Sequence, residues 1–415
     1  MKISVLAHCS HNKGDNSVLA FLNMMLKDAG VDIHISTSSG EKPFWFIGEP
    51  TVSSWGCGLR FPVKNEKFIG KLIRVARNRI LDKIYYVVLF LFSHNLDKLA
   101  FYVLEAINDK TFKYNIKDSD SVICTGGHHL SSVLDKDGVN SQLMDMLYAV
   151  LCNKKLYLWA QSIGPIETKK NFVLDAIKKL LNRSELICYR DSDSKTFLDN
   201  QNVITKKDLV DDSVFGLAKT LSFDINDLNE RNGRKRAIIA VYTAGKLKSN
   251  TLHNYESILV ASVNYLIELG FSVELLPMQY KGLQDDERPF LNAIKKASNK
   301  ESCVEVLTED MSPFDTLRYL KGADLLIGHK THSVVYGLAL GIPTIAISYH
   351  PKTTFFMSRF DLLDYVIDDK ELRSCIVINK IDLALKNSDC ITKKIESRSN
   401  EMGDSVINAF NKILR

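Results

Sequence analysis

The sequence predicts an α/β protein built from two Rossmann-like domains that face a cleft. Short runs rich in β-branched residues alternate with amphipathic helical patterns, which is typical of βα units and a parallel sheet. The chain of 415 residues is longer than one hydrophobic core usually serves, which indicates two domains. A stretch at residues 216–235, polar and charged in its later part FDINDLNERNGRK, interrupts the pattern and predicts a linker.

The predicted N-terminal domain covers residues 1–215. Its strands are expected at Ile3–Ala7, Asp32–Thr37, Ser121–Cys124, Leu156–Gln161 and Leu186–Tyr189. Its helices are expected at Ser17–Ala29, Asn140–Leu151 and Lys170–Leu181, where apolar residues recur at helical spacing. The stretch Gly40–Leu59 is long, irregular and rich in turn residues, which favours a loop over the cleft.

The predicted C-terminal domain covers residues 236–395. Strands are expected at Ala237–Tyr242, Ser272–Pro277, Cys303–Leu307, Ala323–Gly328 and Thr344–Ser348, and helices at Asn254–Leu269, Asp285–Ala297, Pro313–Lys321 and Val334–Leu340. Residues 396–415 are expected to form a helix that packs back on the N-terminal domain. Two such halves predict a GT-B-like architecture with the active site at the carboxyl edges of both sheets.

Composition excludes several classes of protein. Lysine and arginine total 54 against 49 acidic residues, which leaves no dense basic surface for nucleic acid. The longest apolar run, Ile84–Phe92, is far below the ~20 residues that cross a bilayer, and Ile3–Ala7 is too short for a signal peptide. We therefore expect a cytoplasmic protein. Eight scattered cysteines show no zinc-ligand spacing, so we expect reduced, mostly buried thiols and no metal.

Small and polar residues follow three strands of the N-terminal domain, where open α/β sheets bind their ligands. They are Asn12, Gly14 and Asp15 after the first strand, Gly126, Gly127 and His128 after the third, and Gln161 and Ser162 after the fourth. Tight turns explain these residues equally well, and Asp15 can simply cap the following helix. Arg190, after the fifth strand, can offer a planar fork to a phosphate or carboxylate, or pair with Asp191.

The densest group of candidates follows the expected strand Ala323–Gly328. His329, Lys330 and His332 come next, and a helix is expected to start near Ser333. Lys330 and His332 can face the same way beside the positive end of that helix, which suits a dianionic phosphate. Lys352 follows the next strand. Each of these residues, taken alone, could be an ordinary surface residue. Their joint placement at consecutive strand ends predicts an anion site.

Seven motifs occur in an order that resembles the polysaccharide pyruvyl transferase family over residues 1–360. They are NKGD at Asn12–Asp15, TGGHHL at Thr125–Leu130, AQSIGP at Ala160–Pro165, YRDSDS at Tyr189–Ser194, DDSVF at Asp211–Phe215, LLPMQYKGLQDDE at Leu275–Glu287 and GHKTHSVVYGLALGIPTIAISYHPK at Gly328–Lys352. The sequence departs from the family pattern where Lys330 replaces an arginine, His128 a glycine and Ser213 a proline.

The resemblance implies a transferase that moves a pyruvyl group from phosphoenolpyruvate to two hydroxyls of a sugar in a surface polysaccharide precursor, forming a ketal without a cofactor. His332 is then the acid, and Asp15 is the candidate base. Lys330, Arg190, Lys352 and His329 would bind the donor. Acceptor binding or cleft loops would involve Asn12, Gly14, Gly126, Gly127, His128, Gln161 and Ser162. Two alternatives stay open: a GT-B-type glycosyltransferase that uses a nucleotide sugar, and a binding protein without catalysis.

The stretch from Lys64 to Lys83 predicts a basic amphipathic helix. Its cations are Lys64, Lys67, Lys71, Arg74, Arg77, Arg79 and Lys83, against Glu66 and Asp82. Such a helix can bury an apolar face among lipid headgroups while its cations meet anionic lipid. Equally, Phe68, Leu72, Val75 and Ile84–Phe92 can pack on the N-terminal sheet and leave the cations solvated. A peripheral contact with the inner membrane surface, where the resemblance implies a lipid-linked acceptor, is therefore a hypothesis.

Overall fold

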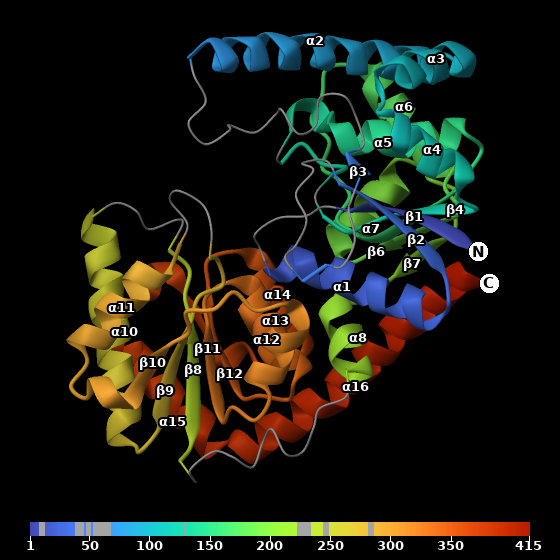
Figure 1. Cartoon of the computed structure of the whole chain (residues 1–415). Helices are drawn as coiled ribbons and strands as arrows, with labels where there is room; N and C mark the ends of the chain where they lie inside the picture. The colour runs from blue at the N-terminus through green and yellow to red at the C-terminus, as the bar shows by residue number, and fades with distance from the viewer. Residues whose placement is uncertain are drawn as a thin grey trace. The chain divides into compact units, whose positions relative to one another are not determined.

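The structure is a computed structural model that describes residues 1–7, 13–37, 45–46, 51–52, 68–127, 129–133, 135–221, 234–243, 249–280 and 286–415. The chain divides into two compact units (Figure 1). Unit 1 comprises Met1–Ser10, Val18–Asp212 and Val406–Arg415, and unit 2 comprises His11–Ser17 and Ser213–Ser405. The first turn of the first helix therefore belongs to unit 2, although the rest of that helix belongs to unit 1.

The described part of unit 1 contains a parallel sheet of seven strands in the order β3-β2-β1-β4-β5-β6-β7. The strands are β1 (Lys2–Ala7), β2 (Asp32–Thr37), β3 (Thr51–Val52), β4 (Ser121–Cys124), β5 (Lys155–Gln161), β6 (Leu186–Tyr189) and β7 (Lys207–Leu209). All five predicted strands are confirmed. The edge strands β3 and β7 were not predicted, because two or three residues are too few to show a period.

Seven helices that lie wholly or mainly in unit 1 are described: α1 (Lys13–Asp28), α2 (Phe68–Ser93), α3 (Asp97–Ile107), α4 (Lys110–Asp118), α5 (Ser141–Leu151), α6 (Asn171–Asn182) and α7 (Ser192–Asn200). α1 begins four residues before the predicted start at Ser17. The hydroxyl of Ser17 donates to the carbonyl of Lys13 at 2.8 Å, so Lys13, Gly14 and Asp15 of the NKGD motif are already helical, whereas the sequence predicts a loop there.

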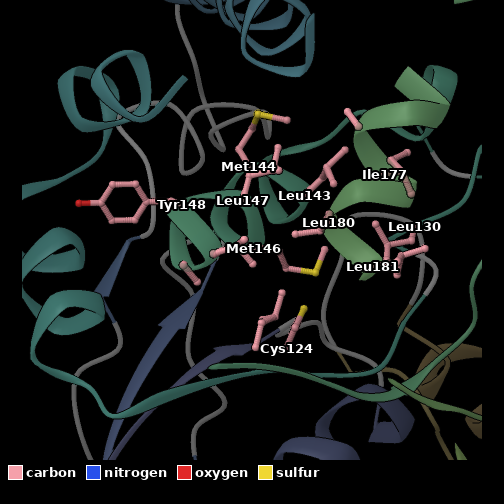
Figure 2. Packing of buried hydrophobic residues seen from close by; sticks show 14 of the residues in the cluster. Cys124, Leu130, Leu143, Met144, Met146, Leu147, Tyr148, Ile177, Leu180 and Leu181 are labelled. Carbon is pink, nitrogen blue, oxygen red and sulfur yellow. The ribbon is translucent and has the colours of Figure 1, made fainter. Parts of the chain in front are cut away.

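Different helices pack on the two faces of the unit 1 sheet. Leu158 belongs to a core cluster with α5 and α6, whose apolar side chains are drawn in Figure 2. The next residue, Trp159, points to the opposite face, because successive side chains of a strand alternate. There it stacks on Phe21 of α1 at 5.8 Å between ring centroids and meets the edge of Phe410 at 5.9 Å. Phe410 lies in the last residues of α16 (Ser388–Leu414), which belong to unit 1.

α2 and α3 form a layer outside α5 and α6 (Figure 1): α2 packs on α6, and α3 packs on α5. α2 joins the basic stretch and the apolar run of the sequence into one helix of 26 residues. It buries one face, made of Leu81, Tyr85, Val88, Leu89 and Phe92. Of the described helices, none is both long and apolar enough to cross a membrane.

Unit 2 contains, in its described residues, a parallel six-stranded sheet in the order β10-β9-β8-β11-β12-β13. The strands are β8 (Arg236–Ala240), β9 (Ser272–Leu276), β10 (Val304–Val306), β11 (Leu325–Gly328), β12 (Thr344–Ser348) and β13 (Val366–Asp368). The helices are α8 (Ser213–Thr220), α10 (Ser249–Glu268), α11 (Arg288–Ala297), α12 (Pro313–Leu320), α13 (Thr331–Ala339), α14 (Pro351–Arg359), α15 (Ser374–Lys386) and α16. The five predicted strands and four predicted helices are found, with shifted ends.

Several details differ from expectation. Residues 216–220, expected in the linker, are helical in α8, because Val214, Phe215 and Leu217 are apolar and buried. Residues 222–233 of that linker lie outside the described residues, as does most of Gly40–Leu59. Among the described cysteines, Cys124 and Cys188 are buried but Cys375 and Cys390 are exposed, so the expectation of mostly buried thiols was wrong. The two exposed cysteines lie on α15 and α16, outside the buried faces of these helices.

Candidate active site

Polar and aromatic residues, together with two methionines, gather at the carboxyl edge of the unit 2 sheet. They are Tyr242 and Thr243 after β8, Met278, Gln279 and Tyr280 after β9, Asp310 and Met311 after β10, His329 and Lys330 after β11, and Tyr349 and His350 after β12. Parallel strands bring their carboxyl ends to one edge, which is where open α/β sheets bind ligands. This edge is therefore the first candidate site.

Lys330 occupies the N-cap position of α13 and is only 6% exposed. Its carbonyl accepts hydrogen bonds from the amide of Ser333 at 2.9 Å and the hydroxyl of Ser333 at 2.7 Å. Its ammonium lies 5.8 Å from the centre of the Tyr242 ring. α13 begins at Thr331, so His332 lies in the first helical turn and not before the helix, whose start was predicted near Ser333. A buried cation and a helix N-terminus thus meet at one point, which favours anion binding.

His329 is fully buried beneath this point and is held by protein groups. Its Nδ1 lies 2.7 Å from the hydroxyl of Tyr255, and its Nε2 lies 3.2 Å from a carboxylate oxygen of Asp369. The rings of Tyr242 and Tyr349 meet it edge-on at 5.8 and 5.9 Å. Burial raises the pKa of Tyr255 well above its ordinary value, so the hydroxyl stays protonated. Because both ring nitrogens face protein atoms, His329 is suited to positioning the β11 end.

Glu287 is a buried carboxyl of this edge that sequence reasoning did not single out. It is 0% exposed, and its Oε2 accepts hydrogen bonds from the amides of Met278 at 2.7 Å and Gln279 at 3.1 Å. Burial raises its pKa to about 7, although the nearby Lys330 ammonium and backbone amides act in the opposite direction. The sequence contained a signal, since Glu287 ends the LLPMQYKGLQDDE motif, but nothing in the pattern showed which of its acids is buried.

The first turn of α1 is attached to the same edge by Lys13, another residue that was not predicted. Lys13 is 3% exposed, and its ammonium donates to the carbonyl of Met311 at 2.7 Å and pairs with Asp310 at 3.2 Å. It also lies 4.7 Å from the centre of the Tyr280 ring. Burial lowers the pKa of Lys13, and Asp310 opposes that change. The lysine of the NKGD motif thus has a structural anchor.

Gly14 and His332, both predicted site residues, are in direct contact. A Cβ atom placed on Gly14 would lie 2.1 Å from Cγ of the His332 ring, so only glycine leaves room for the imidazole. One turn further along α1, the hydroxyl of Ser17 lies 2.5 Å from that of Tyr336 in α13. Asn12 and the side chain of Asp15, also predicted, lie outside the described residues. The structure therefore brings the NKGD backbone and the GHKTH helix together.

Lys352 stands at the start of α14 and is half-buried. The hydroxyls of Thr331 and Thr353 lie 2.7 Å apart and join the first turns of α13 and α14. The amide of Lys352 donates to Nδ1 of His350 at 3.1 Å, and burial together with the Lys352 charge lowers the pKa of His350. The second predicted cation therefore lies on a helix whose start is joined to that of the Lys330 helix.

In unit 1, the predicted residues Gln161, Ser162 and Arg190 meet at the ends of β5 and β6. Nε of Arg190 donates to the Ser162 hydroxyl at 2.9 Å, and that hydroxyl donates to Asp191 at 2.8 Å. The Arg190 amide donates to the carbonyl of Gln161 at 3.2 Å. Arg190 therefore reaches Asp191 through Ser162. Its terminal guanidinium nitrogens donate no hydrogen bond to a residue that the structure describes, which leaves the planar fork for a ligand.

The glycine turn after β4 packs against β5. A Cβ on Gly126 would lie 2.4 Å from the carbonyl oxygen of Ala160, so the backbones approach too closely for any other residue. The carbonyl of Gly127 accepts from the amide of Ser162 at 3.0 Å, and the fully buried Gln161 donates to the carbonyl of Thr125 at 2.6 Å. His128 lies outside the described residues. These glycines and Gln161 therefore build the scaffold that carries Ser162 and Arg190.

No group of three or more histidine, cysteine, aspartate or glutamate side chains in the described residues is arranged to hold a metal ion. Among the described residues, the charged or titratable groups at these two edges include Lys330, Lys352, His332 and Glu287 in unit 2 and Arg190 in unit 1.

Comparisons with known proteins agree with the resemblance of the motifs. The sequence profile of the polysaccharide pyruvyl transferase family matches residues 53–351. A relative from Erwinia amylovora, amylovoran biosynthesis protein AmsJ, is 23% identical over 95% of this chain and 94% of its own length.

Solved structures with the same fold include the UDP complex of S. aureus MnaA, with a TM-score of 0.57, 10% identity, and coverage of 99% of this chain and 95% of that chain. The UDP-GlcNAc 2-epimerase of Neisseria meningitidis, bound to UDP-GlcNAc, also has a TM-score of 0.57 at 10% identity and covers 100% of both chains. At this identity the likeness concerns the fold alone. The predicted α/β, GT-B-like fold of two Rossmann-like domains is confirmed.

Proposed function

The chain belongs to the polysaccharide pyruvyl transferase family, and we propose that it moves the pyruvyl group of phosphoenolpyruvate onto two hydroxyls of a sugar in a surface polysaccharide precursor. The product is a cyclic ketal. The observation that carries this proposal is the buried Lys330 ammonium at the N-terminus of α13, with His332 in the first turn of the same helix. This arrangement suits a small, highly charged donor.

The reaction sets the groups that are required. The enol methylene of the donor gains one proton and becomes a methyl group, which leaves positive charge on the adjacent carbon. Two sugar oxygens bond to that carbon, and the bond to the phosphate oxygen breaks. The sugar gives up two hydroxyl protons in total. In the balanced reaction one proton is gained by the methyl group and one by the released phosphate. An acid, a base and cations for the phosphate and carboxylate are therefore the minimum.

Lys330 and Lys352 are proposed to bind the donor phosphate, because both stand at helix starts in unit 2. Arg190 is proposed for the donor carboxylate, since its free fork can make two parallel hydrogen bonds. His329 is proposed to act on donor binding indirectly, because the contacts of its ring with Tyr255 fix the backbone directly before Lys330. The lysine at position 330 supplies charge, and Arg190 supplies the planar geometry.

His332 is proposed as the acid that protonates the methylene, and Asp15 as the base for the sugar hydroxyls. The contact of Gly14 with the His332 ring supports the pairing, since Asp15 is the next residue along α1. For the acceptor side we propose Asn12, Gly14, Gly126, Gly127, His128, Gln161 and Ser162. The acceptor is proposed to be lipid-linked, and the reaction to take place in the cytoplasm, because phosphoenolpyruvate is an intracellular metabolite.

A binding and transfer assay tests the proposal. Purified protein is titrated calorimetrically with phosphoenolpyruvate and, separately, with UDP-sugars, and is then incubated with each donor and a panel of oligosaccharide acceptors. We expect phosphoenolpyruvate to bind and mass spectrometry to show an acceptor enlarged by one pyruvylidene group, with release of phosphate. Binding of a nucleotide sugar with glycosyl transfer would replace the proposal by a glycosyltransferase. Binding of phosphoenolpyruvate that survives the loss of both Lys330 and Arg190 would contradict the assigned site.

A further inference from the structure

The outward faces of α2 and α3 carry an unusual concentration of exposed apolar side chains. Of the sixteen large apolar side chains exposed in the described residues, seven lie between Val75 and Tyr102. They are Val75, Ile80, Val87 and Phe90 on α2, Leu96 in the turn, and Leu99 and Tyr102 on α3. Ile80 is 59% and Tyr102 65% exposed. Their helices, α2 and α3, form the outermost layer of this side of unit 1 (Figure 1).

The exposed residues of α2 form one face of the helix. Ile80, Lys83, Val87 and Phe90 recur at helical spacing, whereas the buried residues between them pack on α6. α3 buries its own inner face on α5. Because α5 and α6 lie in one layer, the outer faces of α2 and α3 point away from the sheet together. We call the seven apolar residues, together with Arg79, Lys83 and Lys98, the outer helical face.

The charges of this face are mainly positive. Arg79, Lys83 and Lys98 are exposed, and Asp82 is the exposed carboxylate of α2. The carboxylates of α3 are already paired: Asp97 with Lys179 at 2.7 Å, and Glu105 with Lys117 at 2.9 Å. A cavity of about 410 Å³ beside α2 has a charged lining of Arg79, Asp82, Lys83, Asp135, Lys136 and Lys170, of which Lys170 pairs with Asp137 at 2.7 Å.

We propose that the outer helical face binds the surface of a membrane rich in anionic phospholipid. The apolar side chains would enter the region between headgroups and acyl chains, while the cations of α2 and the adjacent cavity meet lipid phosphates. A face that combines exposed apolar residues with unpaired positive charge is complementary to such a surface. This proposal does not depend on the donor or on the reaction.

A second copy of the chain is a poorer occupant of the same face. In a two-fold symmetric contact the same patch lies on both sides, so Arg79, Lys83 and Lys98 of one copy would face a patch that carries the same three cations. Only Asp82 would be present on that face to offset them. Like charges pressed together in an apolar contact are costly, whereas anionic headgroups neutralise them.

Vesicle co-sedimentation of the full chain tests the proposal. The protein is mixed with vesicles of phosphatidylcholine alone or of phosphatidylcholine with phosphatidylglycerol, at low and high salt. We expect binding to the anionic vesicles that weakens as salt rises, because exposed charges are screened. The double variant Arg79→Glu/Lys83→Glu should weaken binding at least about tenfold, and Val87→Glu should weaken it at both salt concentrations.

Matched controls come from the same unit. Ile204 is 85% exposed and Lys206 is also exposed, and both lie outside α2 and α3. Ile204→Glu and Lys206→Glu should bind vesicles as the unaltered chain does. No binding to anionic vesicles at low salt would overturn the proposal, and so would binding that Val87→Glu and the charge variant leave intact. Sedimentation velocity that shows a dimer lost in Val87→Glu, without vesicle binding, would assign the face to a second copy instead.

Discussion

Gly14 lies against the His332 imidazole so closely that a Cβ atom at position 14 would come within 2.1 Å of the ring. The two residues belong to different motifs, one at the start of α1 and one at the start of α13. Lys13 fixes the position of the neighbouring Gly14, because its ammonium binds the carbonyl of Met311 and the carboxylate of Asp310. The hydroxyl of Ser17 lies next to that of Tyr336. The position of the proposed acid is therefore set from both motifs.

Replacing Gly14 by alanine should displace the His332 ring. The added methyl group cannot occupy the space of the ring atoms, so the imidazole must turn away from its position. We expect kcat to fall at least about tenfold, as for a misplaced general acid, with little change in donor affinity.

A double-mutant cycle checks the contact itself. Gly14→Ala should lower the melting temperature of the unaltered chain but not that of His332→Ala, because the smaller side chain leaves room for the methyl group. Equal losses in both backgrounds would mean that Gly14 acts through something other than the His332 ring.

Lys330 and His332 should have separable effects. Lys330→Ala removes a buried cation at the anion site, so we expect the dissociation constant of phosphoenolpyruvate to rise about 10- to 100-fold. His332→Ala removes the proposed acid, so we expect kcat to fall about 10²- to 10⁴-fold with a smaller effect on binding. Calorimetry and steady-state kinetics separate the two. Lys394→Ala, an exposed lysine of α16, is the control. Full activity in both site variants would move the site elsewhere.

Arg190 should not tolerate lysine. Its Nε donates to Ser162 while the terminal nitrogens stay available, and a lysine ammonium cannot keep both geometries. We expect Arg190→Lys to weaken donor binding about tenfold, as for loss of a two-pronged pair. The matched control is Arg183→Lys, since Arg183 pairs with Asp97 at 2.6 Å on another side of the unit. The interpretation is wrong if calorimetry finds the two variants equally affected.

The sequence predicted the strand ends well, because each apolar run was short and followed by turn residues. It predicted helix starts less well: α1 and α13 begin before the predicted residues, since Lys13 and Thr331 contact partners distant in sequence. The roles of Lys13 and Glu287 could not be predicted either. A charged residue in a motif looks the same whether it is exposed or buried, and burial here depends on how distant strand ends pack.

Glu287 should make the stability of the protein depend on pH in an unusual direction. Burial raises the pKa of its carboxyl from 4.5 to about 7, so between these values the folded chain holds a proton that the unfolded chain has lost. The stabilising contribution of this carboxyl is therefore complete below its pKa in the unfolded chain, 4.5, and is lost as pH rises through its pKa in the folded chain, about 7. Glutamine cannot ionise. Relative to the unaltered chain, Glu287→Gln should gain up to about 3 kcal/mol of unfolding free energy over this range.

Urea unfolding of both proteins at about pH 5 and about pH 8 measures this difference. The neighbouring Asp286 supplies a control that should not respond to this change of pH, because its hydrogen bonds with Arg288 lower the pKa of that carboxyl from 3.8. The carboxyl is ionised in both the folded and the unfolded chain at about pH 5 and at about pH 8, so Asp286→Asn should differ from the unaltered chain by the same free energy of unfolding at both values. If Glu287→Gln lost relative stability at the higher pH, the buried carboxylate would be stabilising in its charged form, and the Lys330 ammonium would outweigh the cost of burial.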